Sequence, residues 1–333
     1  DDACPVDVGR AVAQDLVKGY GDRHTNLRDP QQARRTRAEM RGLSVERVGL
    51  RLVPQDTLAV VGYVRPGSPA ARAGLEVGTL VRTINGEKPT SAALVVAEDA
   101  GRVTLALADR TLTLTPETLP ARDLPTLRVV GDVNVVNIPS FLGEGVARGF
   151  FELLRGLDPA RPLVVDVRAN GGGSLTECLL ASSAFTEARH ELATGQWKTT
   201  YVARQGALSV NGRRSVDLGA VRAAPAARVA VLVSNRTASC GEVFAANLQR
   251  AGATVVGVPT AGVRNSAVGL YDLSDGGMLS VTTSRALDAS GRLVDAAVVP
   301  DRAVTVSADS LPGAGDPVLK TAVDLFVPAT AAR

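Results

Sequence analysis

Lysine, histidine and cysteine are scarce in this chain of 333 residues. It contains two histidines, three cysteines and only four lysines. Cys4, Cys178 and Cys240 are too few and too irregularly spaced for a disulfide framework or a metal cage. We expect no metal and no cofactor. We also expect separate buried thiols, Cys240 being a small one beside Ser239, while a single bridge between Cys4 and Cys178 stays open.

Long apolar runs and runs of like charge are also missing. No apolar stretch reaches the ~18 residues that a membrane span needs. The net charge is only +3, and the one basic cluster, between Arg34 and Arg41, has no interleaved aromatics. Such a cluster is typical of the solvated face of a polar helix. Nucleic acid is therefore not an expected partner.

The chain begins without an initiator methionine. Removal of a signal sequence or a lipid anchor would explain this start. We therefore expect a periplasmic or cell-envelope location.

The patterns that are present divide the chain into four parts. Apolar residues make up 45% of it, as in a globular protein. Helical spacing comes first, then short alternating strands with PGSP and NGEKP turns, then strands that alternate with helices in an α/β pattern. The predicted parts are 1–44, an N-terminal helical segment; 45–117, a strand-rich unit; 118–306, an α/β core; and 307–333, a C-terminal helix on the core.

The strand-rich unit resembles a PDZ domain. It contains SPAARAGLEVGTLVRTING, which matches the PDZ core pattern except that Thr79 replaces the usual Asp. Gly49, Leu50, Arg51 and Leu52 take the place of the loop whose backbone N–H groups hold a peptide's C-terminal carboxylate. The resemblance implies a module that adds peptide tails to a sheet edge. A PDZ fold kept only as a hinge or lid is the alternative.

Two turns of the α/β core are rich in small residues. One strand ends in Gly171 to Gly173, whose backbone N–H groups are unshielded, as an oxyanion site requires. Another is followed by TASCGE and a helix, and Ser239 at this helix start has the steric freedom and the dipole that suit a nucleophile. Taken alone, the TASCGE stretch favours a simpler role for Ser239 as an ordinary helix cap.

Five motifs in order resemble the tail-specific or C-terminal-processing serine peptidase family, whose relatives include the tricorn core protease. The chain reads VRANGGG, TASCGE, VPTAG, DASGR and AVVPD at the corresponding places. Members also carry an N-terminal helical segment and an inserted PDZ domain, so the similarity covers nearly the whole chain. It implies a peptidase core of mixed β-sheets and helices in a crotonase-like ββα spiral.

The resemblance also assigns roles to single residues. Ser239 corresponds to the nucleophile, because it lies three positions before Glu242 of the SASE-like motif. The oxyanion donors correspond to the backbone N–H groups of Cys240 and Gly172. Glu242 is expected to support the helix start.

The usual base of the family is absent. Processing peptidases use a lysine in a TFGKG motif, but here Val263 takes its place and the next residue, Arg264, stays protonated at any working pH. The tricorn-like branch draws a histidine from a DxHT motif, and this chain has GDRHTNL. His24 is therefore the predicted base. A loop histidine bound to local backbone is the alternative.

A histidine base usually needs an acceptor that fixes its tautomer. By resemblance Asp295 is one candidate, and Asp22 is another because it is so near His24 in sequence. The acid partner is left open. His190 matches no motif and is predicted to be a surface residue.

Two functions are open at this stage. The first is a serine endopeptidase for protein or peptide substrates with exposed C-terminal tails. The second is an inactive pseudopeptidase that only holds such tails. The missing lysine favours the second, whereas the presence of Ser239, the glycines and His24 opposes it. The sequence leaves the substrate, the cleavage preference and homo-oligomer formation undecided.

Overall fold

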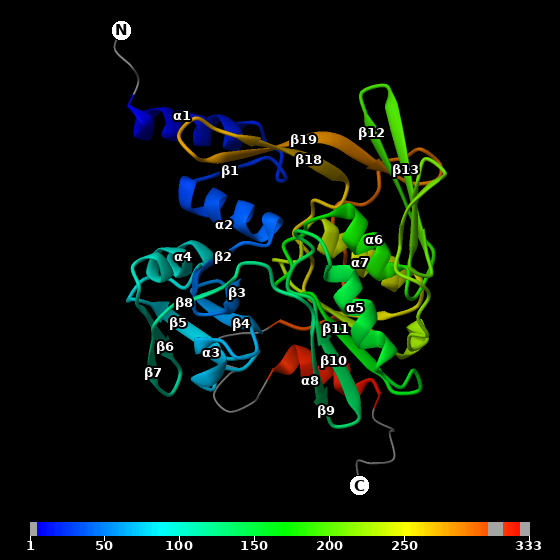
Figure 1. The fold of residues 1–333 in the computed structure, drawn as a ribbon, viewed down its shortest axis with the longest axis horizontal. Helices are drawn as coiled ribbons and strands as arrows, with labels where there is room; N and C mark the ends of the chain where they lie inside the picture. Colours follow the sequence, from blue (N-terminus) through cyan, green and yellow to red (C-terminus); the bar gives the residue numbers. More distant parts are fainter. Residues whose placement is uncertain (1–4, 306–315, 327–333) are drawn as a thin grey trace.

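A six-stranded sheet lies at the centre of the computed structural model, which describes residues 5–305 and 316–326 (Figure 1). The strand order is β20-β17-β16-β11-β10-β9, and all strands but β9 run parallel. The strands are β9 (Thr126–Val130), β10 (Val133–Asn137), β11 (Leu163–Asp166), β16 (Val229–Val233), β17 (Thr254–Gly257) and β20 (Arg302–Ala303).

Both faces of this sheet are covered by helices. Every residue of β10, β11 and β16 is buried, as parallel strands between two layers require. Alternate side chains join one apolar cluster with α5 (Val146–Arg155), α6 (Leu175–Ser182) and α7 (Cys240–Arg250). The others face α8 (Pro317–Asp324), the closing helix that the sequence predicts. The α/β fold class is thus confirmed.

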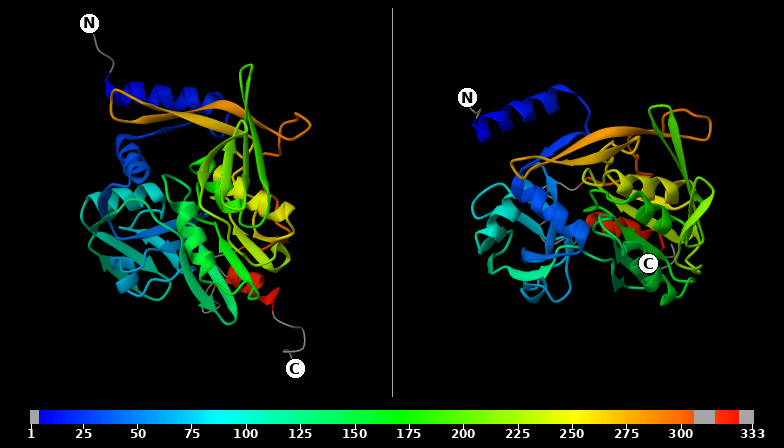
Figure 2. Two further views of the ribbon diagram at one scale, coloured as in Figure 1. Left: turned by 45° about the vertical axis from the view of Figure 1, so that its right-hand side comes forward. Right: turned by 45° about the horizontal axis from the view of Figure 1, so that its top comes forward.

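A second sheet is antiparallel and lies above the six-stranded sheet in the view of Figure 1. Its strands are β1 (Asn26–Arg28), β12 (Ala188–Thr194), β13 (Trp197–Arg204), β14 (Ala207–Val210), β15 (Arg213–Asp217), β18 (Ser266–Asp272) and β19 (Met278–Leu287). The β18–β19 hairpin reaches over to the N-terminal helices in all views (Figures 1 and 2). The short helix η1 (Ala226–Arg228) leads from this sheet into β16.

Residues 50–114 form a separate five-stranded unit with its own apolar core. It contains β3 (Leu50–Gln55), β4 (Leu58–Val64), α3 (Pro69–Arg72), β5 (Leu80–Ile84), α4 (Ser91–Asp99), β6 (Val103–Leu107) and β7 (Thr111–Leu114). The strand β3 is at the sheet edge. A two-stranded ribbon of β2 (Ser44–Arg47) and β8 (Glu117–Pro120) closes the unit where the chain enters and leaves it.

The N-terminal segment contains two helices, in agreement with the prediction. It also contains one strand, β1, that the sequence did not predict. The helices are α1 (Val6–Gly19) and α2 (Pro30–Arg41). Asp29 caps α2 through the N–H of Gln32, and Gly42 ends the helix at φ 68°. Between them, β1 pairs with β19, with Asn26 opposite Ser280. None of the helices within the described ranges has the length and apolar character of a membrane span.

Candidate active site

Ser239 lies at the junction of β16 and α7, in a tight turn of small residues. The Thr237 hydroxyl donates to the carbonyl of Val167 at 2.9 Å, and the Ala238 N–H donates to the carbonyl of Asn170 at 3.0 Å. Ser239 itself has φ 50° and ψ −117°, a backbone conformation that costs energy for a residue with a Cβ. Strain of this kind concentrates at functional sites, where the surrounding contacts enforce it.

The carboxylate of Glu242 is the main contact that holds this turn. It is fully buried and accepts from the Ser239 N–H at 2.8 Å. It also accepts from the Thr260 hydroxyl at 2.6 Å and from the N–H groups of Gly262 and Val263 at 2.7 and 3.1 Å. Glu242 therefore supports the helix start, as expected, and also ties it to the segment that follows β17.

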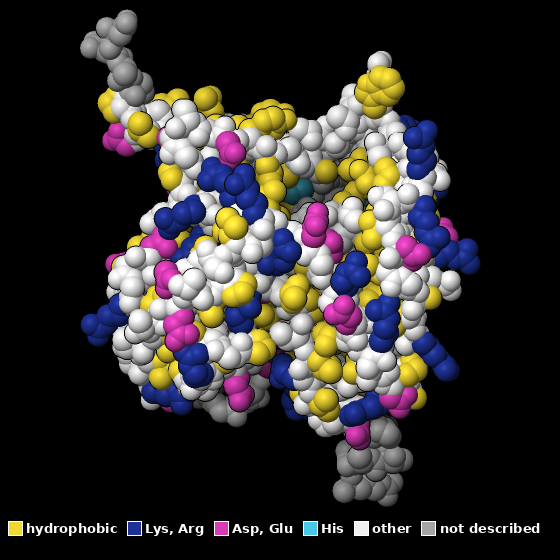
Figure 3. All heavy atoms as spheres, in the orientation of Figure 1, with side chains coloured by type: hydrophobic (Ala, Val, Ile, Leu, Met, Phe, Trp, Pro, Cys, Tyr) yellow, Lys and Arg dark blue, Asp and Glu magenta, His cyan; other side chains and the backbone are white. Residues whose placement is uncertain are grey.

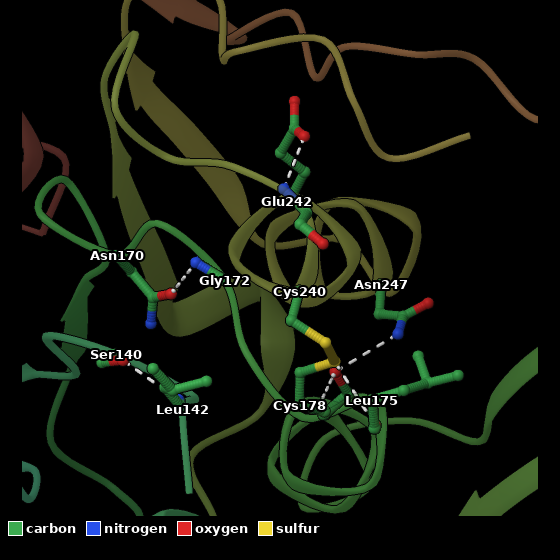
Figure 4. Close-up of a disulfide and its surroundings, with 11 residues drawn as sticks. Ser140, Leu142, Asn170, Gly172, Leu175, Cys178, Cys240, Glu242 and Asn247 are labelled. Atoms are coloured by element: carbon green, nitrogen blue, oxygen red, sulfur yellow. Dashed lines mark hydrogen bonds between the residues drawn. A yellow bond between two sulfur atoms is a disulfide. The ribbon is translucent and has the colours of Figure 1, made fainter. Parts of the chain in front are cut away.

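The triple-glycine turn after β11 packs directly on Ser239. A Cβ on Gly172 would lie 2.8 Å from the Ser239 Cβ and 3.3 Å from the Cys240 nitrogen, and Gly172 has φ 102°. Only glycine fits this close approach in this conformation. The structure thus brings together three of the predicted site residues, and Figure 4 shows Gly172 beside the start of α7.

The two predicted oxyanion donors differ in their present contacts. The turn and cap hydrogen bonds of the described residues include none from the Cys240 N–H, as expected at the first position of a helix. The Gly172 N–H, in contrast, donates to Asn170 Oδ1 at 2.9 Å (Figure 4). Cys240 can therefore serve an oxyanion directly, whereas Gly172 must first leave its side-chain acceptor.

The prediction of separate thiols is wrong. Cys178 of α6 and Cys240 of α7 form a disulfide, with Cα atoms 5.7 Å apart (Figure 4). This pairing also rules out the bridge between Cys4 and Cys178, and Cys4 itself lies outside the described residues. The two cysteines are 62 positions apart. Their contact arises from the packing of α6 on α7, which sequence spacing does not reveal.

His24 lies just before β1 and is 9% exposed. Its Nδ1 is 2.9 Å from the hydroxyl of Ser266, and its backbone N–H donates to Asp22 Oδ1 at 3.2 Å. Burial lowers the pKa of the imidazole, with the charge of Arg28 acting in the same direction and that of Asp22 opposing it. The ring is therefore neutral at pH 7, as a general base must be.

His24 and Ser239 are not in contact in this structure. Among the hydrogen bonds of the described residues, none joins the two side chains. The segment 262–266 contacts both sites: Glu242 accepts from the Gly262 N–H, and Ser266 contacts the His24 ring. A cavity of about 390 Å³ is lined by this segment and by the loop before His24.

The acid candidates do not bind the imidazole. The Asp295 side chain is 97% exposed, and Arg264 lies 4.0 Å from it. Asp22 contacts the backbone of His24 and the Thr25 hydroxyl rather than the ring. The group that orients the ring is Ser266, which sequence reasoning missed because it belongs to none of the motifs.

The second histidine requires a correction. His190 is not a surface residue: it sits on β12, is half-buried and faces a cavity along α7. Burial and the charge of Arg264 lower its pKa to about 4. The strand β12 and the helix α7 both line this cavity, an arrangement that the local sequence around His190 does not indicate.

The four residues predicted to bind peptide lie at the edge of the five-stranded unit. Gly49 precedes β3, and Leu50 to Leu52 begin it. A cavity of about 180 Å³ beside this strand is lined by Leu50, Leu52 and Leu94 of α4, and also by Arg236 of the Ser239 turn. This cavity thus reaches the turn that carries Ser239, and peptide binding there stays a prediction. Figure 3 shows the surface in the orientation of Figure 1, with a histidine side chain visible in a hollow at the upper centre.

Comparisons with known proteins agree with this arrangement. Residues 132–304, more than half of the chain, match peptidase family S41, and residues 60–98 match the PDZ domain. The chain therefore belongs to peptidase family S41, and it carries a PDZ domain ahead of the peptidase core.

Two curated relatives have related names. The carboxy-terminal processing protease CtpA of Bacillus subtilis is 21% identical over 84% of this chain and 60% of its own length. The tail-specific protease of Haemophilus influenzae is 28% identical over 49% of this chain and 27% of its own length. The chain thus spans only part of the length of either relative.

Solved structures share the fold. A putative S41 protease from Bacteroides fragilis has a TM-score of 0.58 at 16% identity, covering 98% of this chain and 92% of its own. A photosystem II D1 C-terminal processing protease has a TM-score of 0.53 at 23% identity, covering 90% of this chain and 82% of its own.

Proposed function

We propose that this protein is a serine endopeptidase that binds the C-terminal tails of protein substrates through its PDZ domain. The observation that carries the proposal is the placement of Ser239 at a strained helix start, directly against Gly172 and beside the Cys240 N–H, which makes no turn or cap hydrogen bond within the described residues. A nucleophile with adjoining backbone donors is the arrangement that acyl transfer needs.

In the proposed reaction the Ser239 hydroxyl attacks the scissile carbonyl and an acyl-enzyme forms, which water then hydrolyses. Because Ser266 holds Nδ1 of His24, Nε2 is the nitrogen left to take the serine proton. Because no hydrogen bond joins His24 to Ser239 among the described residues, the reaction requires a rearrangement that brings Nε2 to the serine hydroxyl, and the conformation described is then a resting state.

A tail-holding pseudopeptidase is the second candidate. The absence of a hydrogen bond between His24 and Ser239 in the described residues favours it. In that case the PDZ groove binds peptide tails while the serine stays unreactive.

Labelling with a fluorophosphonate probe separates the two candidates. We expect labelling of the wild-type protein at Ser239, mapped by mass spectrometry, and none of the Ser239→Ala variant. Absence of labelling in the presence of a tail peptide, under conditions that label a related S41 peptidase, would support the pseudopeptidase.

We also propose a periplasmic or cell-envelope location. The disulfide between Cys178 and Cys240 supports it, because such bonds persist in oxidising compartments. Alkylation in intact cells followed by reduction should label both cysteines only after reduction. Labelling of both before reduction would contradict the proposal.

A further inference from the structure

A second cavity follows the helix that begins at Ser239. Its volume is about 340 Å³, and α7 contributes Val243, Asn247 and Arg250 to its wall. These side chains recur at the spacing of the helix face that starts at Ser239. The strand β12, the end of β19 and the turn after it close the other sides. The cavity therefore begins about one helical turn after the candidate nucleophile, on the same helix face.

Arg264 connects this cavity to the catalytic turn. It lines the cavity and directly follows Val263. The same oxygen of Glu242, Oε2, accepts from the N–H groups of Val263 and Ser239. One carboxylate thus fixes both the nucleophile and the segment that carries Arg264.

The acidic residues of the cavity wall already have partners. Glu191 pairs with Arg189 on the same strand. Asp288 accepts from the Ser290 hydroxyl at 2.6 Å and lies 3.5 Å from an Arg292 nitrogen. Neither carboxylate is paired with the remaining arginines of the wall.

Arg264 and Arg250 are left without a close counter-charge. Arg264 is 17% exposed, and its Nε donates to the backbone carbonyl of Asp295 at 3.0 Å. Its nearest carboxylate oxygen in the described residues is that of Asp295, 4.0 Å away on a side chain that points to solvent. Arg250 donates to Asn247 Oδ1 at 2.9 Å and forms no ion pair among the described residues.

The two guanidinium groups act on each other. Burial lowers the pKa of Arg264, and the charge of Arg250 lowers it further against the opposing effect of Asp295 and Glu242. Even so, a guanidinium stays protonated at neutral pH. His190, with its pKa near 4, is neutral and adds no charge. The cavity wall therefore presents two guanidinium groups that have no carboxylate partner closer than 4.0 Å among the described residues, while Glu191 and Asp288 are bound to other groups.

We propose that this cavity binds a carboxylate of the substrate next to the scissile bond, with Arg264 and Arg250 as specificity residues. The inference rests on the proposed peptidase function. Planar guanidinium groups bind carboxylates through paired N–H donors, and a partly buried cation is stabilised by such a partner. The carboxylate comes either from an acidic side chain or from the free end of the peptide.

Binding to the Ser239→Ala protein tests the cavity without turnover. The probes are four short peptides that combine an internal Glu or Gln with a C-terminal acid or amide. We expect at least one carboxylate to tighten binding about tenfold, the size expected of a charge-assisted hydrogen bond. Preference for Glu identifies the side chain, and preference for the acid identifies the chain end.

Further variants assign the preference to the cavity. In the Ser239→Ala background, Arg264→Gln and Arg250→Gln should each remove most of it. The control Arg213→Gln, an exposed arginine on β15, should keep it. Equal binding of all four peptides overturns the proposal. A carboxylate preference that persists in both the Arg264→Gln and the Arg250→Gln variant also overturns it, because the preference then arises elsewhere, for example in the PDZ groove.

Hydrolysis of the same peptides by the wild-type protein separates this proposal from the proposed function. If the peptides are cleaved but bind without a carboxylate preference, the carboxylate site is refuted and the proposed peptidase function stands. If carboxylate binding depends on Arg264 but no peptide is cleaved, the carboxylate site stands and the proposed peptidase function is refuted. Thermal melts of every variant confirm that each has folded.

Discussion

At the scale of single residues, the site depends on a few contacts that hold Ser239 in an unfavourable backbone conformation. Its φ of 50° is compensated by the hydrogen bond from its N–H to Glu242 and by the glycine turn against it. The energy of such strain is of order 1–3 kcal/mol, which neighbouring contacts must offset. Substitutions at these contacts should therefore affect activity more than stability.

Glu242→Gln tests this point. All four groups that face the carboxylate are donors, so an amide nitrogen leaves at least one of them without an acceptor, at a cost of about 1–3 kcal/mol. We expect a lower melting temperature together with a loss of most peptidase activity, measured well below the melting temperature.

Glu177→Gln is the matched control. Glu177 is also buried and accepts from the N–H groups of Gly145 and Ala147, at the start of α5 rather than α7. It should lower the melting temperature while keeping the turnover number. Equal residual activity in the two variants would contradict the role of Glu242.

His24 determines the pH dependence that we expect. A general base must be neutral, and burial lowers the pKa of His24 below its usual value of 6.5. The activity, measured as kcat/KM, should therefore decrease towards acid pH with a midpoint below 6.5. The substitution His24→Ala should lower kcat/KM about 10²-fold or more. A midpoint above 6.5, or normal turnover by the variant, would refute His24 as the base.

At the scale of elements, the disulfide joins the helix that carries the nucleophile to its neighbour. Cys240 is the first residue of α7, and Cys178 lies inside α6. Both helices also pack on the central sheet through the same apolar cluster. The bond thus adds a covalent restraint at the helix start, next to Ser239 and the predicted oxyanion donor.

Removing this bond should destabilise the fold. Closure of a loop spanning 62 positions corresponds to about 4 kcal/mol in the chain-entropy description. We expect the double variant Cys178→Ala, Cys240→Ala to melt at a clearly lower temperature than the wild type. Reductant should lower the melting temperature of the wild type but leave that of the double variant unchanged. An equal effect of reductant on both would contradict this prediction.

At the scale of the whole molecule, Asp123 joins the PDZ domain to the linker that enters the core. Its side chain is fully buried, and its carboxylate oxygens lie 3.0, 2.7 and 3.0 Å from guanidinium nitrogens of Arg47, Arg51 and Arg65. A second link lies nearby, where the Asn137 side chain donates to the carbonyl of Gly62 at 2.8 Å. These contacts hold the PDZ domain, with the cavity beside β3, against the core.

Asp123→Asn should destabilise the protein by about 3–5 kcal/mol, because it leaves three buried or half-buried arginines without their shared partner. The control Asp132→Asn changes a fully exposed carboxylate 3.8 Å from Arg161 and should have almost no effect. Chemical denaturation at pH 7 measures both. Equal unfolding free energies for the two variants would refute the role of Asp123.

The effect of Asp123 should also depend on pH. Burial alone would raise its pKa, but the charges of Arg51, Arg47 and Arg65 outweigh burial and hold the pKa below the usual 3.8. The stabilisation is therefore complete above the pKa of the unfolded state and is lost as the pH falls through the lower folded value. The difference between wild type and Asp123→Asn should accordingly shrink only in strongly acidic solution.

Local patterns in the sequence determined much of this protein. The alternation of strands with helices predicted the α/β core, in which β10, β11 and β16 are buried between two layers of helices. The glycine turn and the helix start were predicted from small residues, and their contact through Gly172 and Ser239 agrees with the order of the motifs. Family membership followed from that order.

Only the tertiary structure decided the contacts between distant segments. The disulfide, the pairing of β1 with β19, the contact of His24 with Ser266 and the cavity shared by His190 and Arg250 all join residues far apart in the chain. Sequence periodicity reports which side of an element is buried, but it does not report which partner covers that side. The partners depend on how the elements pack, and this packing brings Gly172 and Cys178 against the helix start that carries Ser239.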